Sequence, residues 1–559
     1  MTPMATRSFL PNPTLYPDAQ PYWDGAREGR LMIKRCLDCG QAHHYPRPHC
    51  PFCGSARTEW LSACGDATVY SFSIVRAAPR PTAVAVVELP EGPRLTTAIV
   101  NADVHALAIG DAVQMTTMPG ENGLAVPVFT TARAEAARAY SARVLRQAHA
   151  VDGLADDAQG PPIRQVAVVG AGSMGCGIAT ALLLAELPTL LIDQDDAALE
   201  RARATVQSNL QALVKRERLR PEQAEARLAM LRTSLHIAEV AQVDLVIEAV
   251  WEQMALKQKI FALLDQHARA DAILASNTST LDIHKLAAVT RRPGAVVGLH
   301  FFSPAHVMPL LEIVRTAQTD AATLAASRWL GQRLAKVPVV VGVCDGFVGN
   351  RLMMARDTEA DRLLLEGALP EQVDRVLTEF GLPMGTYELA DMAGGIELVY
   401  RLNQDRGRSN WLIEQLFALG RLGQRAGKGF YRYEAGKRKP LVDPEVTALI
   451  EQASVQAGLA RRVIADDEVR DRLILPMVNE GAKLLEEGIA ARAGDIDVVW
   501  QRGFGWPDWK GGPMYHADQI GLPEVVRRLE LLARDHGDRF TPCTLLRRMA
   551  QEGRTFAAA

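Results

Sequence analysis

Val166-Ala-Val-Val-Gly-Ala-Gly-Ser-Met-Gly-Cys-Gly-Ile-Ala179 is predicted to form an apolar strand, a glycine-rich turn and the start of a helix. Its glycines have the spacing Gly-x-Gly-x-x-Gly. The first glycine makes a tight turn, the second lets a phosphate approach the backbone, and the third allows close helix–strand packing. The stretch therefore predicts an α/β fold that holds a pyrophosphate at a helix N-terminus. The residues predicted to contact it are Gly170, Gly172, Ser173, Met174 and Gly175.

A second apolar strand ends beside a carboxylate. Residues 189–192 are predicted to be this strand, and Asp193 follows it, roughly 20 residues after the glycine turn. A carboxylate at this place accepts the ribose hydroxyls of NAD and repels the extra phosphate of NADP. A purely structural turn is the alternative, and the combination of strand, helix and acidic residue disfavours it. The sequence predicts an NAD site.

The composition limits the class of protein. The chain has 559 residues, 48% of them hydrophobic, which suits several domains with buried cores. No apolar run approaches the length that spans a membrane. The formal net charge of −3 gives no general basic field for nucleic acid. The first residues carry no apolar signal core, and Phe556-Ala-Ala-Ala559 is not a peroxisomal signal, so we expect a cytoplasmic protein.

Four of the eight cysteines lie in one short segment. Cys36-x-x-Cys39 and Cys50-x-x-Cys53 form two knuckles separated by ten residues. Four thiolates at this spacing can close a tetrahedral shell around Zn²⁺. Chance clustering and a redox pair are the alternatives, and the doubled motif disfavours both. Because four thiolates complete the shell, we expect a structural zinc and place the intervening His43, His44 and His49 at the surface.

The next segment is rich in strands. Residues 67–75, 83–89, 94–100 and 111–117 are short strand candidates at even spacing, which predicts a small barrel. Together with the four cysteines and the motifs at 22–31, 65–72 and 127–129, this part resembles the zinc-ribbon/OB-fold acyl-CoA-associated proteins over about residues 14–132. The resemblance implies acyl-CoA handling or docking of a thiolase-like partner. An OB barrel can also bind nucleic acid, but the neutral charge and the lack of interleaved aromatic and basic residues disfavour that function.

Strand candidates alternate with helical segments after the glycine turn. Residues 243–250, 272–275 and 295–299 are predicted strands, which indicates a doubly wound sheet. His300 follows the last of them, and Glu312 lies in the next apolar run. An imidazole can accept a hydroxyl proton during alcohol oxidation, and a buried carboxylate on its other nitrogen fixes the tautomer. A structural histidine, with Glu312 pairing to Arg315, is the alternative.

From Val166 to about Arg401 the chain resembles the 3-hydroxyacyl-CoA dehydrogenase family. The matching motifs are the glycine turn, Glu248-Ala-Val-Trp-Glu252 with Lys257, Ser276-Asn-Thr-Ser279, His300-Phe-Phe-Ser-Pro-Ala-His-Val-Met308 with Glu312, and Gly346-Phe-Val-Gly-Asn-Arg351. The resemblance implies that His300 is the catalytic base, that Glu312 orients it, and that Ser279 and Asn350 contact the substrate oxygen. It also implies cofactor contacts for Glu252, Lys257 and Asn277. Ser303 replaces the asparagine of many members, as it often does in the multifunctional β-oxidation enzymes.

A basic stretch lies between Asp193 and Val243. Lys215, Arg216 and Arg218 belong to it, and a solvated helix face is one interpretation of their charges. In the family this helical excursion reaches towards CoA, so a contact with the CoA phosphates is the other interpretation.

The C-terminal part contains an internal repeat of roughly 120 residues, and both copies are predicted to be helical. Asn350 and Arg351 of the first copy correspond to Asp471 and Arg472 of the second. Because it has Asp471 in place of Asn350, the second copy is predicted to be non-catalytic. The family resemblance implies that the two copies pair within one chain, with the zinc-OB module in the place of the usual hydratase half.

These observations predict a multidomain chain: a zinc-ribbon/OB-fold domain at 14–132, a helix and linker at 133–162, an NAD-binding Rossmann domain at 163–343, and two tandem all-α domains at 344–435 and 436–557. The resemblance implies NAD-dependent oxidation of (S)-3-hydroxyacyl-CoA to 3-oxoacyl-CoA in a β-oxidation-like route. The alternatives are a dehydrogenase of a free hydroxy acid and a catalytically weak acyl-CoA-binding scaffold for a thiolase. The oligomeric state is left open.

Overall fold

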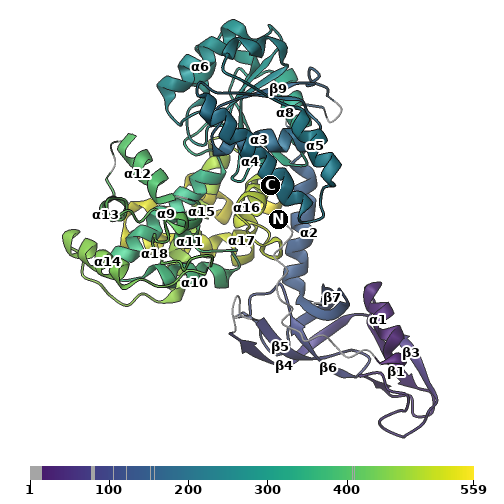
Figure 1. Cartoon of the computed structure of the whole chain (residues 1–559). Helices are drawn as coiled ribbons and strands as arrows, with labels where there is room; N and C mark the ends of the chain where they lie inside the picture. Colours follow the sequence, from purple (N-terminus) through teal and green to yellow (C-terminus); the bar gives the residue numbers. More distant parts are fainter. Residues whose placement is uncertain are drawn as a thin grey trace. The chain divides into compact units, whose positions relative to one another are not determined.

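The computed structural model describes residues 16–76, 82–104, 106–120, 123–151, 153–155, 158–393, 395–405, 407, 409–437 and 439–558 (Figure 1). The predicted domain start at residue 14 and the linker positions 152, 156 and 157 lie outside these ranges. The chain divides into two compact units. The first holds residues 1–140 with two short later segments, and the second holds most of the remainder.

A small antiparallel sheet forms the zinc-ribbon part of the first unit. Its strand order is β2-β1-β3, with β1 (Met32–Cys36) between β2 (Ala42–His43) and β3 (Thr58–Ser62). Helix α1 (Gln20–Arg27) buries Tyr22 and Trp23 in the core of this unit. The two knuckles follow β1 and precede β3, so the sheet brings the two loops together.

A closed five-stranded barrel follows, in the order β4-β5-β6-β8-β7. Its strands are β4 (Asp66–Val75), β5 (Thr82–Glu88), β6 (Arg94–Ile99), β7 (Ala112–Pro119) and β8 (Ala125–Thr131). Alternate residues of β5 are buried, as the period of a strand with one core face requires. The predicted barrel is confirmed. Strand β8 was not among the strands predicted for it. Pro127 lies inside it, and proline disfavours a strand interior.

An eight-stranded sheet forms the first part of the second unit, in the order β11-β10-β9-β12-β13-β14-β15-β16. The strands are β9 (Val166–Val169), β10 (Thr189–Ile192), β11 (Leu231–Ser234), β12 (Leu245–Glu248), β13 (Ile273–Ser276), β14 (Val296–Phe301), β15 (Leu310–Arg315) and β16 (Val337–Gly342). Neighbouring strands are parallel except β14 and β15, which are antiparallel. Strands β11 and β16 lie at the two edges and were not among the predicted strands. Most central strands are buried on both faces, so they show continuous apolar runs.

Helices connect these strands and cover the sheet (Figure 1). They are α3 (Ser173–Leu184), α4 (Asp196–Val214), α5 (Pro221–Ala229), α6 (Met254–His267), α7 (Ile283–Ala287) and α8 (Ala321–Arg333), preceded by α2 (Ala132–Gln147). Because β10 and β12 flank β9 on opposite sides, the strand order reverses at β9. Ligands bind beyond the carboxyl ends of strands at such a switch point, and the glycine turn lies at this position.

The remainder of the second unit is helical. Its first copy contains α9 (Gly349–Glu366), α10 (Pro370–Phe380), α11 (Thr386–Ala393), α12 (Gly395–Asp405) and α13 (Trp411–Ala418). Helix α14 (Pro444–Gln456) precedes the second copy, which contains α15 (Asp466–Glu486), α16 (Ala493–Gly503), α17 (Pro513–Ile520), α18 (Leu522–His536) and α19 (Thr544–Gln551). Helices α9 and α15 pack on each other, so the two copies pair within one chain. Among the described residues, no helix is both long and apolar enough to cross a bilayer.

The two copies also share their internal anchors. In the first, Asp374 accepts the backbone N–H groups of Tyr387 and Glu388 at the start of α11, at 3.0 and 2.9 Å. In the second, Asp497 accepts those of Met514 and Tyr515 at the start of α17, at 2.7 and 3.1 Å. Each pair places a carboxylate at a helix N-terminus, where the backbone donors lack helical partners. The sequence repeat is therefore a repeat of structure.

Candidate active site

The glycine turn lies between β9 and α3. Gly170 has φ +110°, and a Cβ added to it would lie 2.6 Å from the Ala249 carbonyl oxygen. A Cβ on Gly175 would lie 1.9 Å from the Gly170 oxygen. Gly172 instead borders open space, and it caps α3, whose first residues are Ser173 and Met174. The free N–H groups of a helix N-terminus thus border an opening that no Cβ fills, as a pyrophosphate cradle requires.

Asp193 follows β10 directly and is half-buried. Its Oδ2 accepts the backbone N–H of Ala171 at 2.8 Å, and its Oδ1 accepts that of Asp195 at 3.2 Å. The carboxylate is therefore fixed beside the glycine turn, where a ribose would follow the pyrophosphate. The residues present fit NAD.

His300 and Glu312 face each other across β14 and β15. They are directly opposed in the antiparallel register, and His300 Nδ1 lies 2.7 Å from Glu312 Oε2. The side chains of His300 and Glu312 are both buried, whereas Arg315 at the end of β15 is exposed. Pairing between Glu312 and Arg315, the alternative considered from sequence, is therefore not observed. Because Nδ1 faces the carboxylate, Nε2 is the ring nitrogen left to exchange a proton with a substrate.

The other oxygen of Glu312 is held by the first helical copy. Oε1 accepts the backbone N–H groups of Val348 and Gly349 at 3.2 and 3.0 Å, at the start of α9. A buried carboxylate is stable when it is paired and hydrogen-bonded, and a helix N-terminus supplies donors and a favourable dipole. The start of α9 therefore helps to hold Glu312 in place beside His300.

Ser279 and Asn350 also come together. Asn350 Nδ2 donates to the Ser279 carbonyl at 3.3 Å, although the two residues belong to different predicted domains. Glu252 Oε1 accepts the backbone N–H of Ser279 at 2.9 Å and its hydroxyl at 3.3 Å. The structure thus brings Ser279, Asn350 and Glu252 to one place.

Glu252 also belongs to an ion network with the buried Lys257 and Glu248. Lys257 Nζ lies 2.7 Å from Glu248 Oε1 and 3.3 Å from Glu252 Oε2. Burial alone would raise the pKa of Glu252, but the charge of Lys257 and the hydrogen bond from Thr278 hold it below its ordinary value. Glu248 is fully buried, and the motif in which it lies did not predict its ion pair with Lys257. An acidic residue that ends an apolar strand is the signal that could have singled it out.

Asn277 and Lys336 fix the backbone around the dyad. Asn277 Oδ1 accepts the backbone N–H of Phe301 at 2.9 Å, which joins the ends of β13 and β14. Lys336 Nζ donates to the carbonyls of Ala305 and Met308 at 2.6 and 2.5 Å, in the loop between β14 and β15. Burial lowers the pKa of Lys336 to about 8. Lys336 was missed from sequence, where an isolated lysine carries no signal.

The basic stretch directly follows α4. Lys215, Arg216 and Arg218 are exposed at the turn between α4 and α5. Their exposure is compatible with both interpretations of these charges.

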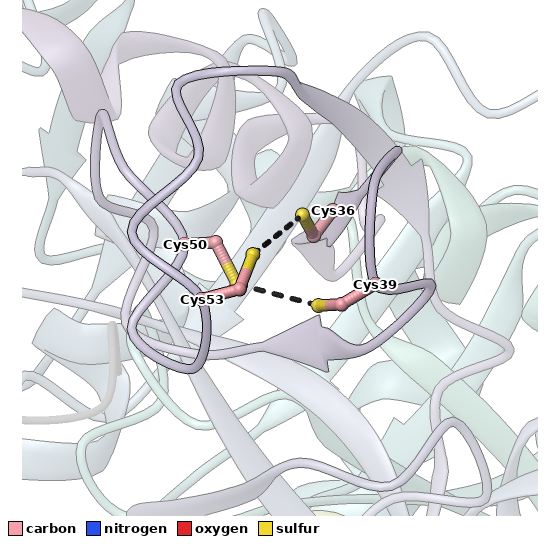
Figure 2. A group of neighbouring side chains, drawn as sticks. All are labelled: Cys36, Cys39, Cys50 and Cys53. Carbon is pink, nitrogen blue, oxygen red and sulfur yellow. Dashed lines mark hydrogen bonds between the residues drawn. The ribbon is translucent and has the colours of Figure 1, made fainter.

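The four cysteines meet in the first unit. Cys36 and Cys53 have Sγ atoms 3.6 Å apart, those of Cys39 and Cys50 are 3.7 Å apart, and all four lie within 4.8 Å of one another. Figure 2 shows the sulfur atoms turned towards one another from the two knuckles. Tetrahedral Zn–S bonds of about 2.3 Å require sulfur separations of about 3.8 Å. The geometry fits a structural zinc bound by four thiolates.

Of the three histidines between the knuckles, His43 differs from its predicted surface position. Its side chain is buried in the ribbon sheet, whereas His49 is exposed and His44 is half-buried. The reason is the strand period: Ala42 and His43 form β2, which pairs with β1 and turns His43 towards the core.

The chain matches the sequence models of known protein families. Residues 165–344 match the model of the 3-hydroxyacyl-CoA dehydrogenase NAD binding domain, and residues 346–433 and 469–558 match its C-terminal domain. Residues 23–59 match the ChsH2 rubredoxin-like zinc ribbon domain, and residues 60–117 match the ChsH2 C-terminal OB-fold domain. The two dehydrogenase models cover more than half of the chain. The chain belongs to the 3-hydroxyacyl-CoA dehydrogenase family, and it carries a zinc ribbon and an OB fold at its N-terminal side.

Individual relatives agree with this assignment. The chain is 38% identical over 402 residues to the peroxisomal fatty acid beta-oxidation multifunctional protein MFP2 of Arabidopsis thaliana, covering 70% of this chain and 55% of that protein. It thus spans about half the length of the curated relatives it matches. The 3-hydroxybutyryl-CoA dehydrogenase of Escherichia coli K12 is 27% identical, with a TM-score of 0.60, covering 70% of this chain and 99% of that one. The dehydrogenase part of multifunctional enzyme 1 from C. elegans is 29% identical, with a TM-score of 0.55, covering 73% and 96%.

The zinc site gives a testable prediction. Metal analysis of the purified chain is expected to find about one zinc per chain, because four thiolates form one closed shell. Cys36→Ser or Cys53→Ser should lose the metal and the fold of the ribbon, since binding and folding are coupled in such sites. Cys64→Ser is the matched control, because the exposed Cys64 is outside the cluster. An iron chromophore, or a full zinc content in both knuckle variants, would contradict the assignment.

Proposed function

We propose that the chain oxidises (S)-3-hydroxyacyl-CoA thioesters to 3-oxoacyl-CoA, with NAD as the hydride acceptor, in a β-oxidation-like route. The observation that carries the proposal is the buried pair of His300 and Glu312, whose carboxylate is also held by the start of α9. A positioned base with a charge partner is what removal of a hydroxyl proton requires.

His300 acts as the base in this proposal. The substrate hydroxyl gives its proton to Nε2 while the C3 hydrogen leaves with its electron pair, and the C3–O bond becomes a carbonyl. Bound NAD supplies the acceptor for that hydride. Glu312 holds the imidazole by Nδ1 and stabilises the positive charge that the ring gains, while two backbone N–H groups hold the other carboxylate oxygen.

Ser279 and Asn350 orient the substrate oxygen in this proposal. Their adjacency and their position at the end of β13 and the start of α9 support the role. The Ser279 hydroxyl donates a hydrogen bond to Glu252 at 3.3 Å. Because this hydrogen bond is long, a bound substrate oxygen could replace Glu252 as its acceptor. We assign Gly170, Gly172, Ser173, Met174, Gly175, Asp193, Glu252, Lys257 and Asn277 to the NAD side of the site.

The first unit is proposed to recruit a thiolase-like protein. The product of the dehydrogenase, a 3-oxoacyl thioester, is what a thiolase cleaves, and both ChsH2 family models lie in this unit. The knuckle tips support the proposal: Leu37 and Phe52 occupy the two knuckles and are 52% and 61% exposed. Apolar side chains exposed on both knuckles suit a protein interface. The cytoplasmic location stays a prediction, since the relatives named above include a peroxisomal protein.

An NADH assay across a panel of 3-hydroxyacyl-CoA thioesters tests the function directly. His300→Ala is expected to lower kcat by about 10²–10⁴-fold and to leave NAD affinity unchanged, because only the base is lost. Glu312→Gln should also be severe, since the imidazolium loses its charge partner. His284→Ala is the control, because that side chain is exposed on α7. Near-wild-type turnover in either dyad variant would refute these roles, and a preference for free hydroxy acids over thioesters would favour the alternative substrate class.

Cofactor choice is expected to depend on the charge of Asp193. Asp193→Asn keeps an oxygen that can accept the Ala171 N–H but removes the repulsion of the NADP phosphate. The wild type should strongly prefer NAD, and the variant should narrow the ratio of kcat/KM between the two cofactors. Asp195→Asn, two residues further on, serves as the control. Equal use of NAD and NADP by the wild type would contradict this role of Asp193.

Docking is tested by co-purification from the native host. Full-length protein is expected to retain a thiolase-type protein that a chain without its first 150 residues loses. The double variant Leu37→Ser with Phe52→Ser should lose it as well while keeping its zinc, because neither residue is a ligand. Dehydrogenase activity of the shortened chain should remain, since every assigned catalytic residue follows the linker. If the full-length protein retains no such partner, docking by this unit is excluded.

A further inference from the structure

The two helical copies exchange matching ion pairs. Arg351 at the start of α9 donates from Nε to Glu480 at 3.0 Å and, through both Nη atoms, to Glu487 at 2.5 and 2.8 Å. Glu480 lies in α15, and Glu487 directly follows that helix. Arginine paired with a carboxylate through two parallel hydrogen bonds has a fixed geometry as well as a favourable charge.

The reciprocal pair lies at the other end of the same interface. Arg472 of α15 donates from Nε to Glu359 at 2.6 Å and, through both Nη atoms, to Glu366 at 2.5 and 2.7 Å. In the repeat, Arg351 corresponds to Arg472, Glu359 to Glu480, and Glu366 to Glu487. Each copy therefore gives the other the same contacts that it receives, as in an isologous dimer interface.

The surroundings of the two arginines differ. Arg351 follows Gly349 and Asn350, which contact Glu312 and Ser279 of the candidate site. Arg472 follows Asp471, whose carboxylate lies 3.3 Å from Arg528 of α18, another element of the second copy. The reciprocal pairs share these hydrogen bonds, although Arg472 also donates to Glu468 at 3.2 Å. Only the pair of Glu480 and Glu487 with Arg351 lies beside the proposed catalytic residues.

The chain segment before Arg351 needs such an anchor. Gly346 and Phe347 both have positive φ, +78° and +51°, just before α9 begins. A bulky residue in this region is strained and stays there only when its surroundings fix it. The backbone N–H groups of Asn350 and Arg351 both donate to the Gly346 carbonyl, at 3.1 and 3.2 Å. Holding the Arg351 side chain therefore also holds the turn that presents the Val348 and Gly349 N–H groups to Glu312.

The second copy also packs against the same turn and the strands behind it. A Cβ added to Gly349 would lie 2.8 Å from the ring of Phe504, which follows α16. The Phe504 ring lies 5.5 Å from that of Phe302, which lies 4.4 Å from the His300 ring. Gly342 at the end of β16 donates to the Ile489 carbonyl at 2.7 Å. The second copy thus contacts the start of α9, the end of β16 and the residue beside His300.

We propose that Glu487 and Glu480 of the second helical copy are positioning residues for catalysis, acting through Arg351 on the start of α9. The second copy thereby sets the geometry of Glu312, Ser279 and Asn350. This inference rests on the proposed dehydrogenase function, and it assigns a part in that function to a copy without its own catalytic asparagine.

The repeat supplies a matched control for the test. Glu487→Gln and Glu366→Gln each remove one carboxylate from the same kind of double hydrogen bond with arginine. Glu366 is the less exposed of the two, at 20% against 44%, so its loss should lower the melting temperature at least as much. In NADH assays on the full chain, Glu487→Gln is expected to lower kcat by about 10-fold, because small displacements of positioned groups slow the chemical step. The KM for NAD should stay within about twofold, since the glycine turn is untouched. Glu366→Gln should keep kcat within about twofold of the wild type.

A second measurement is independent of turnover. Hydrogen–deuterium exchange should become faster at the start of α9, residues 346–352, in Glu487→Gln, and stay unchanged there in Glu366→Gln. An equal loss of kcat in both variants, or unchanged exchange in Glu487→Gln, would overturn the inference. If none of the 3-hydroxyacyl-CoA thioesters in the panel supports NAD reduction by the wild type, the proposed function is refuted. The exchange comparison still decides whether Glu487 holds the start of α9.

Discussion

The buried carboxylate of Glu312 is the interaction on which the candidate site depends. Its two oxygens are committed to different parts of the second unit: one to His300 on the neighbouring strand, the other to two backbone N–H groups that open α9. An ionised carboxylate with no exposed surface is tolerated only when such partners are present. The antiparallel strand β15 matters for the same reason, because its reversed direction places Glu312 opposite His300. The sheet and the first helical copy must therefore be correctly packed before the His300 ring can be oriented.

Much of this arrangement could be predicted from sequence because its signals are local. The glycine turn, the four cysteines and the acidic residue after β10 have fixed spacings, and the strands and loops they predicted are present. The dyad needed the family resemblance, since a histidine and a glutamate separated by a loop have no distinctive local pattern. The structure adds the geometry that joins these residues into one site.

The features that were missed depend on contacts between distant segments. Strand β8 contains a proline, and its place in the barrel follows from pairing with β7 and β6. Strands β11 and β16 are edges of the sheet, recognisable only once their neighbours are known. Glu248 and Lys336 became visible through their partners, a buried lysine and two loop carbonyls. His43 was misplaced because the two-residue strand that buries it is too short to show a period.

The reciprocal pairs of Arg351 and Arg472 have a consequence for how the interface assembles. Where a symmetric interface joins separate subunits, its occupancy depends on protein concentration, and any substitution appears on both sides at once. Here both halves belong to one chain, so the local concentration of one copy around the other is set by the covalent connection between them. The two copies therefore meet without a diffusive encounter. Each side of the interface is also encoded separately, so one copy can carry Asn350 while the other carries Asp471 at the corresponding position.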